Sequence, residues 1–338
     1  MTTSRSFSNQ FEVTDYTQEL NLIPNTWGLI NELGIFSEEG ITQNTVTLES
    51  KAGTVAVVND QKRGTRAQVG KDEVATIRAF VTTHHPYDDA LFASELQGRR
   101  AYGTQDQPDT EANAIAAKLA RIRMAHSQTL ELARMSTIVN GTQWAPNGTV
   151  SENFYTTFGI TRKEVDCVLG TATTEVGEKI QEAVAHIQDN ILSGENVNGF
   201  VVLCGTNFFN KLIRQANVKE AYKFYASTQE GQRNGYRSGR YRIFDYQSVR
   251  FIEYRGSIGG NTLIGTDEAR MVPLGTVDTF KTLFSPAQKF DLVNTVGEPS
   301  YVWTYRDSKN TKIEVESESN FLNLLRRPAS IVRLFSSN

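Results

Sequence analysis

The segment from His84 to Asp89, with the sequence HHPYDD, holds the densest group of side chains that could perform acid–base or metal chemistry. Imidazole nitrogens and carboxylates bind Zn²⁺ and act as general bases, so one hypothesis is a metal-dependent hydrolase. Successive side chains of a strand point to opposite faces, however, so His84 and His85 cannot easily bind one ion, and Pro86 then bends the chain. We therefore expect no catalytic and no metal-binding residues, and a protein that is not an enzyme.

The cysteines and the glycine-containing turns carry no cofactor signature. Cys167 and Cys204 lie far apart without a CxxC pattern, and the four histidines show no zinc spacing. The sequence CGTN at residues 204–207 is not a GxGxxG fingerprint, and no Walker lysine follows a glycine loop. We expect both thiols to be buried and free, and we expect no cofactor-binding residues.

Two segments concentrate basic residues. Between residues 61 and 71 the cations, with no acid among them, are Lys62, Arg63, Arg66 and Lys71. Between residues 219 and 242 tyrosines and glycines surround further cations, which include Arg233, Arg237 and Arg240. Each segment is compatible with a solvated surface loop, and the second is also compatible with phosphate binding and base stacking.

The overall charge argues against a dedicated DNA-binding protein. The 338 residues include 35 basic and 38 acidic side chains, which gives a formal net charge of -3. Strong nucleic-acid binding needs a basic excess, so we expect any contact with DNA to be weak and non-specific. No apolar run approaches ~20 residues, so we expect a soluble protein that is made in a cytoplasm and does not bind a membrane.

The elements that would position these residues begin with one long helix. Residues 111–139 contain no Gly or Pro, Thr110 offers an N-cap oxygen, and Asn140-Gly141 supplies a left-handed exit. About 29 residues at ~1.5 Å each give a rod of about 43 Å, which we call the spine helix. Before it, alternating β-branched residues between 44 and 81 predict a long β-hairpin whose tip carries the first basic segment.

Beyond the spine helix the pattern predicts a small α/β unit and then a sheet. Helices are expected at 175–192 and 207–216, and strands at 154–158, 165–169, 200–204 and 249–254. Further short strands, expected to form one antiparallel sheet beside the spine helix, are 269–273, 279–284, 290–294, 301–306, 312–318 and 321–325. At this length, two packed units with extensions are expected, in an α+β fold.

The order of these parts, together with two stretches, resembles the lambda-type major capsid protein E family, which has the HK97-like coat fold of tailed bacteriophages. The first stretch contains MVPLG at 271–275, Phe280, SPA at 285–287, VNT at 293–295, Gly297, Pro299 and Tyr301. The second is FLNLLRRPASIVR at 321–333, which is similar to the strand, Arg-Pro and strand ending of these coats. The resemblance extends over roughly residues 20–336.

The resemblance implies a division of the chain into four parts. These are an N-terminal arm (1–40), an extended β-hairpin loop (41–86), a peripheral domain (87–170 and 268–328) and an axial α/β domain (171–267 and 329–338). Compared with some relatives, the chain lacks a long helical region before the arm, so we expect a separate scaffolding protein or none. Lys62 and Lys71 could serve in the covalent crosslinks that some relatives form, but no partner is marked, so we predict none.

The function implied is that of a structural coat protein of the virion. Many copies are expected to form pentamers and hexamers in an icosahedral shell around double-stranded DNA, assembled in the bacterial host cytoplasm. A portal is a further expected partner, and the sequence leaves open whether a decoration protein binds the shell. An encapsulin-like compartment shell is the alternative within the same fold. The residues expected to contact neighbouring subunits are Lys62, Arg63, Arg66, Lys71, Arg233, Arg237 and Arg240.

Overall fold

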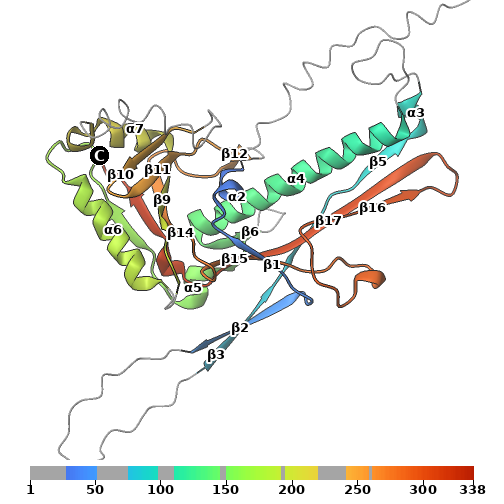
Figure 1. The fold of residues 1–338 in the computed structure, drawn as a ribbon, viewed down its shortest axis with the longest axis horizontal. Coiled ribbons are helices and arrows are strands. Elements are labelled where there is room, and N and C mark those ends of the chain that lie inside the picture. The colour runs from blue at the N-terminus through green and yellow to red at the C-terminus, as the bar shows by residue number, and fades with distance from the viewer. Residues whose placement is uncertain are drawn as a thin grey trace, which may run out of the picture.

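Two six-stranded sheets, connected by one long helix, organise the chain (Figure 1). The computed structural model describes residues 28–51, 75–97, 110–144, 150–191, 195–219, 241–258 and 261–338. Helices and strands together in two separate sheets confirm the predicted α+β class. No helix in these ranges is long and apolar enough to cross a membrane.

The predicted spine helix is α4 (Glu111–Asn140). Its N-cap is Thr110, whose side-chain oxygen accepts a hydrogen bond from the backbone N–H of Asn113 at 3.3 Å. Gly141 ends the helix in the left-handed conformation, with φ of 66°, and its N–H donates to the carbonyl of Thr137 at 3.0 Å. Both ends therefore follow the capping residues that the sequence contains, and the predicted end is wrong by one residue.

The first sheet is built around one long strand, β17 (Lys312–Leu325). One edge of β17 pairs with two strands in succession, β16 (Tyr301–Arg306) and β15 (Phe280–Phe284), and the other edge with β5 (Asp89–Phe92) and β4 (Thr83–Pro86). A parallel strand, β1 (Ser37–Gly40), extends the sheet beyond β15. The prediction of two strands at 312–318 and 321–325 is wrong, because Ser319 and Asn320 continue the pairing with β4.

The second sheet has the order β10-β11-β9-β14-β18-β8. Its strands are β10 (Ile243–Tyr246), β11 (Val249–Glu253), β9 (Gly199–Cys204), β14 (Glu268–Leu274), β18 (Val332–Phe335) and β8 (Lys163–Asp166). Alternate side chains separate to two faces: Val201 and Leu203 pack with the end of α4, whereas Val202 and Cys204 pack with α6 (Val176–Asn190) and α7 (Thr206–Arg214). Burial on both faces explains the continuous apolar run of β9.

The strand pairing corrects the predicted sheet membership of one segment. Residues 269–273 do not join the terminal sheet, because β14 pairs with β9 and β18 in the second sheet. β8 is the edge strand of that same sheet. The reason is physical: Met271 and Val272 are both fully buried on opposite faces, as a central strand requires.

Two further segments predicted as strands are helical. Residues 154–158 form α5 (Phe154–Phe158), because the side chain of Asn153 caps the N-terminus and Gly159 ends the turn in the left-handed conformation. Residues 290–294 contain the 3₁₀ turn η3 (Phe290–Leu292) in the connection between β15 and β16. The apolar residues of that connection imitate a strand pattern although no strand pairs with them in the described part of the chain.

The base of the predicted hairpin is confirmed. β2 (Thr45–Lys51) and β3 (Ala75–Val81) pair antiparallel from Thr45 with Val81 to Lys51 with Ala75. Among the described strands they form a two-stranded sheet of their own that extends away from the body of the molecule (Figure 1). The hairpin tip and the first 27 residues lie outside the described residues.

The remaining described elements are short. They are α2 (Leu29–Leu33), α3 (Ala93–Leu96), β6 (Thr142–Trp144), β7 (Val150–Asn153), β12 (Ser257–Ile258), β13 (Asn261–Thr262) and η4 (Pro328–Ser330).

Candidate functional site

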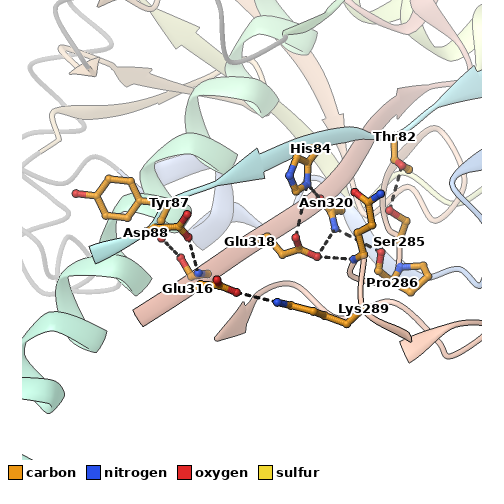
Figure 2. Close-up of polar contacts among 12 residues, drawn as sticks. Thr82, His84, Tyr87, Asp88, Ser285, Pro286, Lys289, Glu316, Glu318 and Asn320 are labelled. Atoms are coloured by element: carbon orange, nitrogen blue, oxygen red, sulfur yellow. Dashed lines mark hydrogen bonds and ion pairs between the residues drawn. The ribbon is translucent and has the colours of Figure 1, made fainter. Parts of the chain in front are cut away.

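The two predicted histidines of β4 point to opposite faces of the first sheet. The Nδ1 atom of His84 lies 2.7 Å from the side-chain oxygen of Asn320 and 3.9 Å from the carboxylate of Glu318 (Figure 2). His85 is buried at 4 % exposure, and its ring stacks on Phe321 with 4.3 Å between the ring centroids. Its Nε2 atom lies 2.8 Å from the hydroxyl of Thr83. The expected divergence of the pair is therefore confirmed.

Burial keeps His85 neutral. Desolvation, together with the nearby His126 and His84, lowers the pKa of His85 from 6.5 to about 4. A neutral ring can stack on an aromatic neighbour without the cost of a buried charge. His85 therefore contributes to the packing between β4 and β17.

The two aspartates of the segment bind different parts of the framework. The carboxylate of Asp88 accepts a hydrogen bond from the backbone N–H of Ser317 at 3.1 Å (Figure 2). Asp89 accepts one from Lys118 of α4 at 3.0 Å, and although burial opposes the charge, Lys118 and the Ala90 N–H lower the pKa of Asp89. The described residues contain no group of three or more His, Cys, Asp or Glu side chains placed to hold a metal. The segment thus connects β5, β17 and α4.

The connection between β15 and β16, residues 285–300, lies on the face of β17 that carries the side chains of Glu316 and Glu318. We call this connection the 285–300 loop. Glu318 accepts hydrogen bonds from the backbone N–H of Gln288 at 2.8 Å and from the amide of Asn320 at 3.2 Å (Figure 2). Lys289 lies 2.7 Å from the carboxylate of Glu316 and stacks its ammonium 4.9 Å from the Trp303 ring centroid. These contacts fix the start of the loop on the sheet.

The 285–300 loop presents apolar side chains to solvent. Phe290 is 99 % exposed, and Val293 and Val296 are each 62 % exposed. A group of exposed apolar side chains on an ordered loop is typical of a protein–protein contact surface. The sequence analysis missed this surface because it assigned Phe290 and Val293 to a strand.

A second region that the sequence analysis missed is a buried acid in the spine helix. Glu131 accepts hydrogen bonds from the backbone N–H groups of Ile30 at 2.9 Å and Asn31 at 3.1 Å, and from the hydroxyl of Tyr254 at 3.4 Å. It therefore connects α4 to α2 and to the end of β11. Burial raises the pKa of Glu131 to about 7, although the donors and Arg134 oppose that rise. The available signal was a charged pair in the apolar half of the helix.

Arg134 completes this buried connection. Its guanidinium donates to the side chains of Asn31 at 2.6 Å, Glu38 at 2.7 Å and Thr282 at 3.1 Å. Asn31 belongs to α2, Glu38 to β1 and Thr282 to β15. One side chain of α4 thus connects two strands of the first sheet, β1 and β15, to the short helix α2.

The predicted cysteines are buried and free, as expected. Burial raises the pKa of Cys167 to about 12 and that of Cys204 well above its usual value, so neither is a reactive thiolate. The seven predicted contact cations lie outside the described residues and stay predictions: Lys62, Arg63, Arg66, Lys71, Arg233, Arg237 and Arg240.

This architecture, a long helix beside an extended sheet, a projecting two-stranded ribbon and a separate mixed sheet, is the HK97-like coat fold. The chain is similar to a subunit in the capsid structure of cyanophage P-SCSP1u, with a TM-score of 0.54 and 11 % identity, over 90 % of this chain and 87 % of that one. The sequence identity is low, so this structural similarity shows the fold alone.

The chain belongs to the phage major capsid protein E family, whose model matches residues 12–336. It is 41 % identical to the major capsid protein of Pseudomonas phage KPP10, over 97 % of both chains. It is 26 % identical to the major capsid protein of Salmonella phage Felix O1, again over 97 % of both. The chain is therefore a shell-forming coat protein, as the sequence pattern predicts.

Proposed function

We propose that many copies of this chain tile an icosahedral head that encloses the double-stranded DNA of a tailed bacteriophage. The observation that supports this most directly is the β2–β3 ribbon, in which Ile77 and Val81 are 70 % and 63 % exposed. A two-stranded ribbon is marginally stable in water unless another surface covers it. A neighbouring subunit supplies that surface, and the shell closes when every ribbon is covered.

The parts of the subunit have different roles in this proposal. The extended loop (41–86) lies over a neighbour, the first sheet and α4 meet other copies at local threefold junctions, and the second sheet surrounds the fivefold and sixfold rings. We include β8 and β14 with the ring-forming part because they pair in its sheet. Contacts to several neighbours allow weak interfaces to find register before the shell closes.

The two basic segments serve as contacts between subunits in this proposal. Ion pairs at an exposed rim contribute about 0–1 kcal/mol each but set the register of an interface. Repeated cations around a ring repel one another, so acidic residues of neighbours should face them. The residues concerned are Lys62, Arg63, Arg66 and Lys71 for the ribbon, and Arg233, Arg237 and Arg240 for the rings.

In this proposal the packaged DNA faces a protein surface that binds it only weakly. The formal net charge of -3 supports weak, salt-screened contact without sequence preference. A purified subunit should bind two unrelated duplexes equally weakly at physiological salt in a fluorescence anisotropy titration. A strong preference for one duplex would contradict this part of the proposal.

The decisive experiment is expression of the chain alone and then with the neighbouring virion genes, followed by electron microscopy and nucleic-acid analysis of the particles. Closed shells that contain DNA support the proposal. In the infected host cell, the proposed assembly partners are scaffolding, portal and decoration proteins. Shells that enclose an enzyme cargo would favour an encapsulin-like compartment. Stoichiometric metal with hydrolase activity would favour the metal-dependent enzyme and contradict the purely structural role.

The role of residues 52–74, which connect the two strands of the ribbon, has its own test. Lys51 and Ala75 are paired directly, so a two-residue Asn-Gly turn can replace residues 52–74 without a change in the register of β2 and β3. The shortened subunit should fold and melt like the full chain yet form no closed particles. Normal particles from this variant would show that residues 52–74 have no assembly role.

A further inference from the structure

We propose that the 285–300 loop of one subunit inserts Phe290 into the groove between α4 and β16 of an adjacent copy. This inference rests on the shell-forming function, because it requires neighbouring copies in contact. It specifies a head-to-tail contact, in which the loop and the groove are different surfaces of the same chain. Such a contact repeats around a ring and leaves no surface of either kind unpaired.

The loop is prepared for this contact before assembly. Lys289 is fixed by Glu316 and Trp303, and the backbone next to it by Glu318. Phe290 follows directly and is 99 % exposed, so the protein holds a large apolar ring in water on a fixed support. A contact residue that is already ordered loses little conformational entropy on binding.

The other end of the loop lies at the base of the ribbon. Gly297 donates its N–H to the carbonyl of Ile41 at 2.9 Å, and Ile41 donates to the carbonyl of Phe284 at 2.7 Å. The approach is so close that a Cβ atom on Gly297 would lie 2.1 Å from the Phe284 carbonyl oxygen. In the view of Figure 1 the loop lies below β17 and α4 lies above it. Loop and ribbon thus share a base and reach toward the same neighbour.

The receiving groove has the size and lining that the loop requires. It has a volume of about 920 Å³, and pockets that bury drug-sized ligands have about 300–1,000 Å³. Its lining is mixed: Leu119, Ile122 and Met124 of α4 and Val302 of β16 are apolar, and Glu32, His126 and Gln128 are among the polar residues. An aromatic ring in such a groove would be removed from water on most of its surface, as the central residues of protein interfaces are.

An acid, Asp291, stands beside Phe290, and the groove carries a cation, Arg123, together with one acid, Glu32. Among the described residues, neither Asp291 nor Arg123 forms a hydrogen bond or an ion pair within the subunit. An Asp291–Arg123 pair at the edge of the buried ring would fix the orientation of the loop in the groove.

The groove has one competing occupant. Gly28 and Glu32 also line it, and residues 1–27 of the same chain precede Gly28. The opposite charges of Asp291 and Arg123 and the exposed Phe290 favour a neighbouring copy, and the experiment separates the two.

The first test uses crosslinking in assembled shells. Gln288→Cys keeps Phe290 and Asp291, and Ser127→Cys adds a thiol to the groove, whereas the native Cys167 and Cys204 are buried. Treated with a short bismaleimide, shells of the double variant should give a ladder of covalent multimers on a denaturing gel, and each single variant should stay largely monomeric. If intact shells of the double variant gave only monomers on the gel, the proposal would be overturned. A separate double variant, Ser127→Cys with Phe11→Cys, tests the competing occupant, and a crosslink between these two residues of one chain would also overturn the proposal.

The second test is a charge exchange. Asp291→Arg and Arg123→Asp should each raise the subunit concentration needed for assembly about tenfold, and the double variant should restore it. Phe290→Ser should abolish assembly without a change in the melting temperature of the subunit. Val150→Ser changes an exposed residue outside the loop and the groove, and it should leave both assembly and the melting temperature unchanged. Unchanged assembly of Phe290→Ser, or no rescue in the double charge variant, would overturn the proposal. If the unaltered chain forms no shells even when it is expressed with the neighbouring virion genes, the proposed function fails instead.

Discussion

The two sheets of the subunit are stabilised in different ways. In the second sheet, central strands such as β9 send apolar side chains to both faces, and helices or the end of α4 cover them. In the first sheet, β17 carries the buried polar run Ser317–Asn320, and Val302 and Tyr305 of β16 stay about two-fifths exposed. The second sheet is thus covered on both faces within one subunit, whereas the first combines buried apolar side chains such as Phe280 and Leu324 with a buried polar run and the partly exposed strand β16.

The largest expected effect on the free energy of unfolding is in the second sheet. Phe251→Ala removes a fully buried ring and should lower the free energy of unfolding by about 3–5 kcal/mol. Tyr305→Ala in β16 of the first sheet removes a ring that is 42 % exposed and should cost far less. Urea titrations of both variants measure the difference, and equal losses would show that β16 is not the incompletely covered part of the subunit.

The next effect concerns Glu131, which connects the two regions. Its pKa is raised from 4.5 to about 7 in the folded chain, so its charge destabilises the fold increasingly as the pH rises from about 4.5 to 7. The penalty above pH 7 is at most about 3 kcal/mol. Glu131→Gln removes this dependence. The gap in free energy of unfolding between the variant and the parent chain should therefore change in the variant's favour from pH 5 to 8.

Urea titrations at four pH values across that range test this expectation. A constant gap between Glu131→Gln and the parent chain would show that Glu131 is charged throughout and that its donors outweigh burial.

His85 has the opposite pH dependence and belongs to the first sheet alone. Its pKa is lowered from 6.5 to about 4, so its contribution is complete above pH 6.5 and is lost as the pH falls toward 4. His85→Phe keeps the stacking on Phe321 and should remove an acid-dependent loss of at most about 3 kcal/mol. Melting scans between pH 4 and 7 measure this, and parallel curves for both chains would contradict it.

The sequence predicted the elements whose signals are local. The spine helix follows from its caps and from the absence of Gly and Pro, and the α6 helix from the spacing of Val176, Ile180 and Val184. The buried strand β9 follows from its apolar run. The diverging His84 and His85 follow from the alternation of a strand. Each of these depends on neighbours within one element.

What the sequence did not predict depends on distant partners. The sheet to which β14 belongs is decided by pairing with β9 and β18, and no local pattern contains that choice. β17 was divided because Ser319 and Asn320 have the composition of a turn, yet β4 pairs with both. The exposed Phe290 imitates a strand residue, since hydrophobicity alone does not distinguish a buried side chain from one kept for a neighbour.

The smallest expected effect on the free subunit is at the ribbon tip. Replacement of Lys62, Arg63, Arg66 and Lys71 together by Glu should leave the melting profile of the subunit unchanged, since surface substitutions usually stay within about 0.5 kcal/mol each. The same variant should form no closed particles, because cations that meet carboxylates of a neighbour become repulsive. Calorimetry of the subunit and microscopy of assembly mixtures measure the two properties, and normal shells from this variant would contradict a contact role.

Hydrogen exchange of the free subunit and of the closed shell tests the central claim most directly, because it compares all described strands in one measurement. Amides of β9, β11 and β14 should be protected in both states, since their sheet is covered on both faces within one subunit. Amides of β2 and β3 should exchange rapidly in the subunit and slowly in the shell. Equal protection of the ribbon in both states would show that the ribbon is an ordinary part of the subunit core. It would contradict the proposal that a neighbouring subunit covers the ribbon.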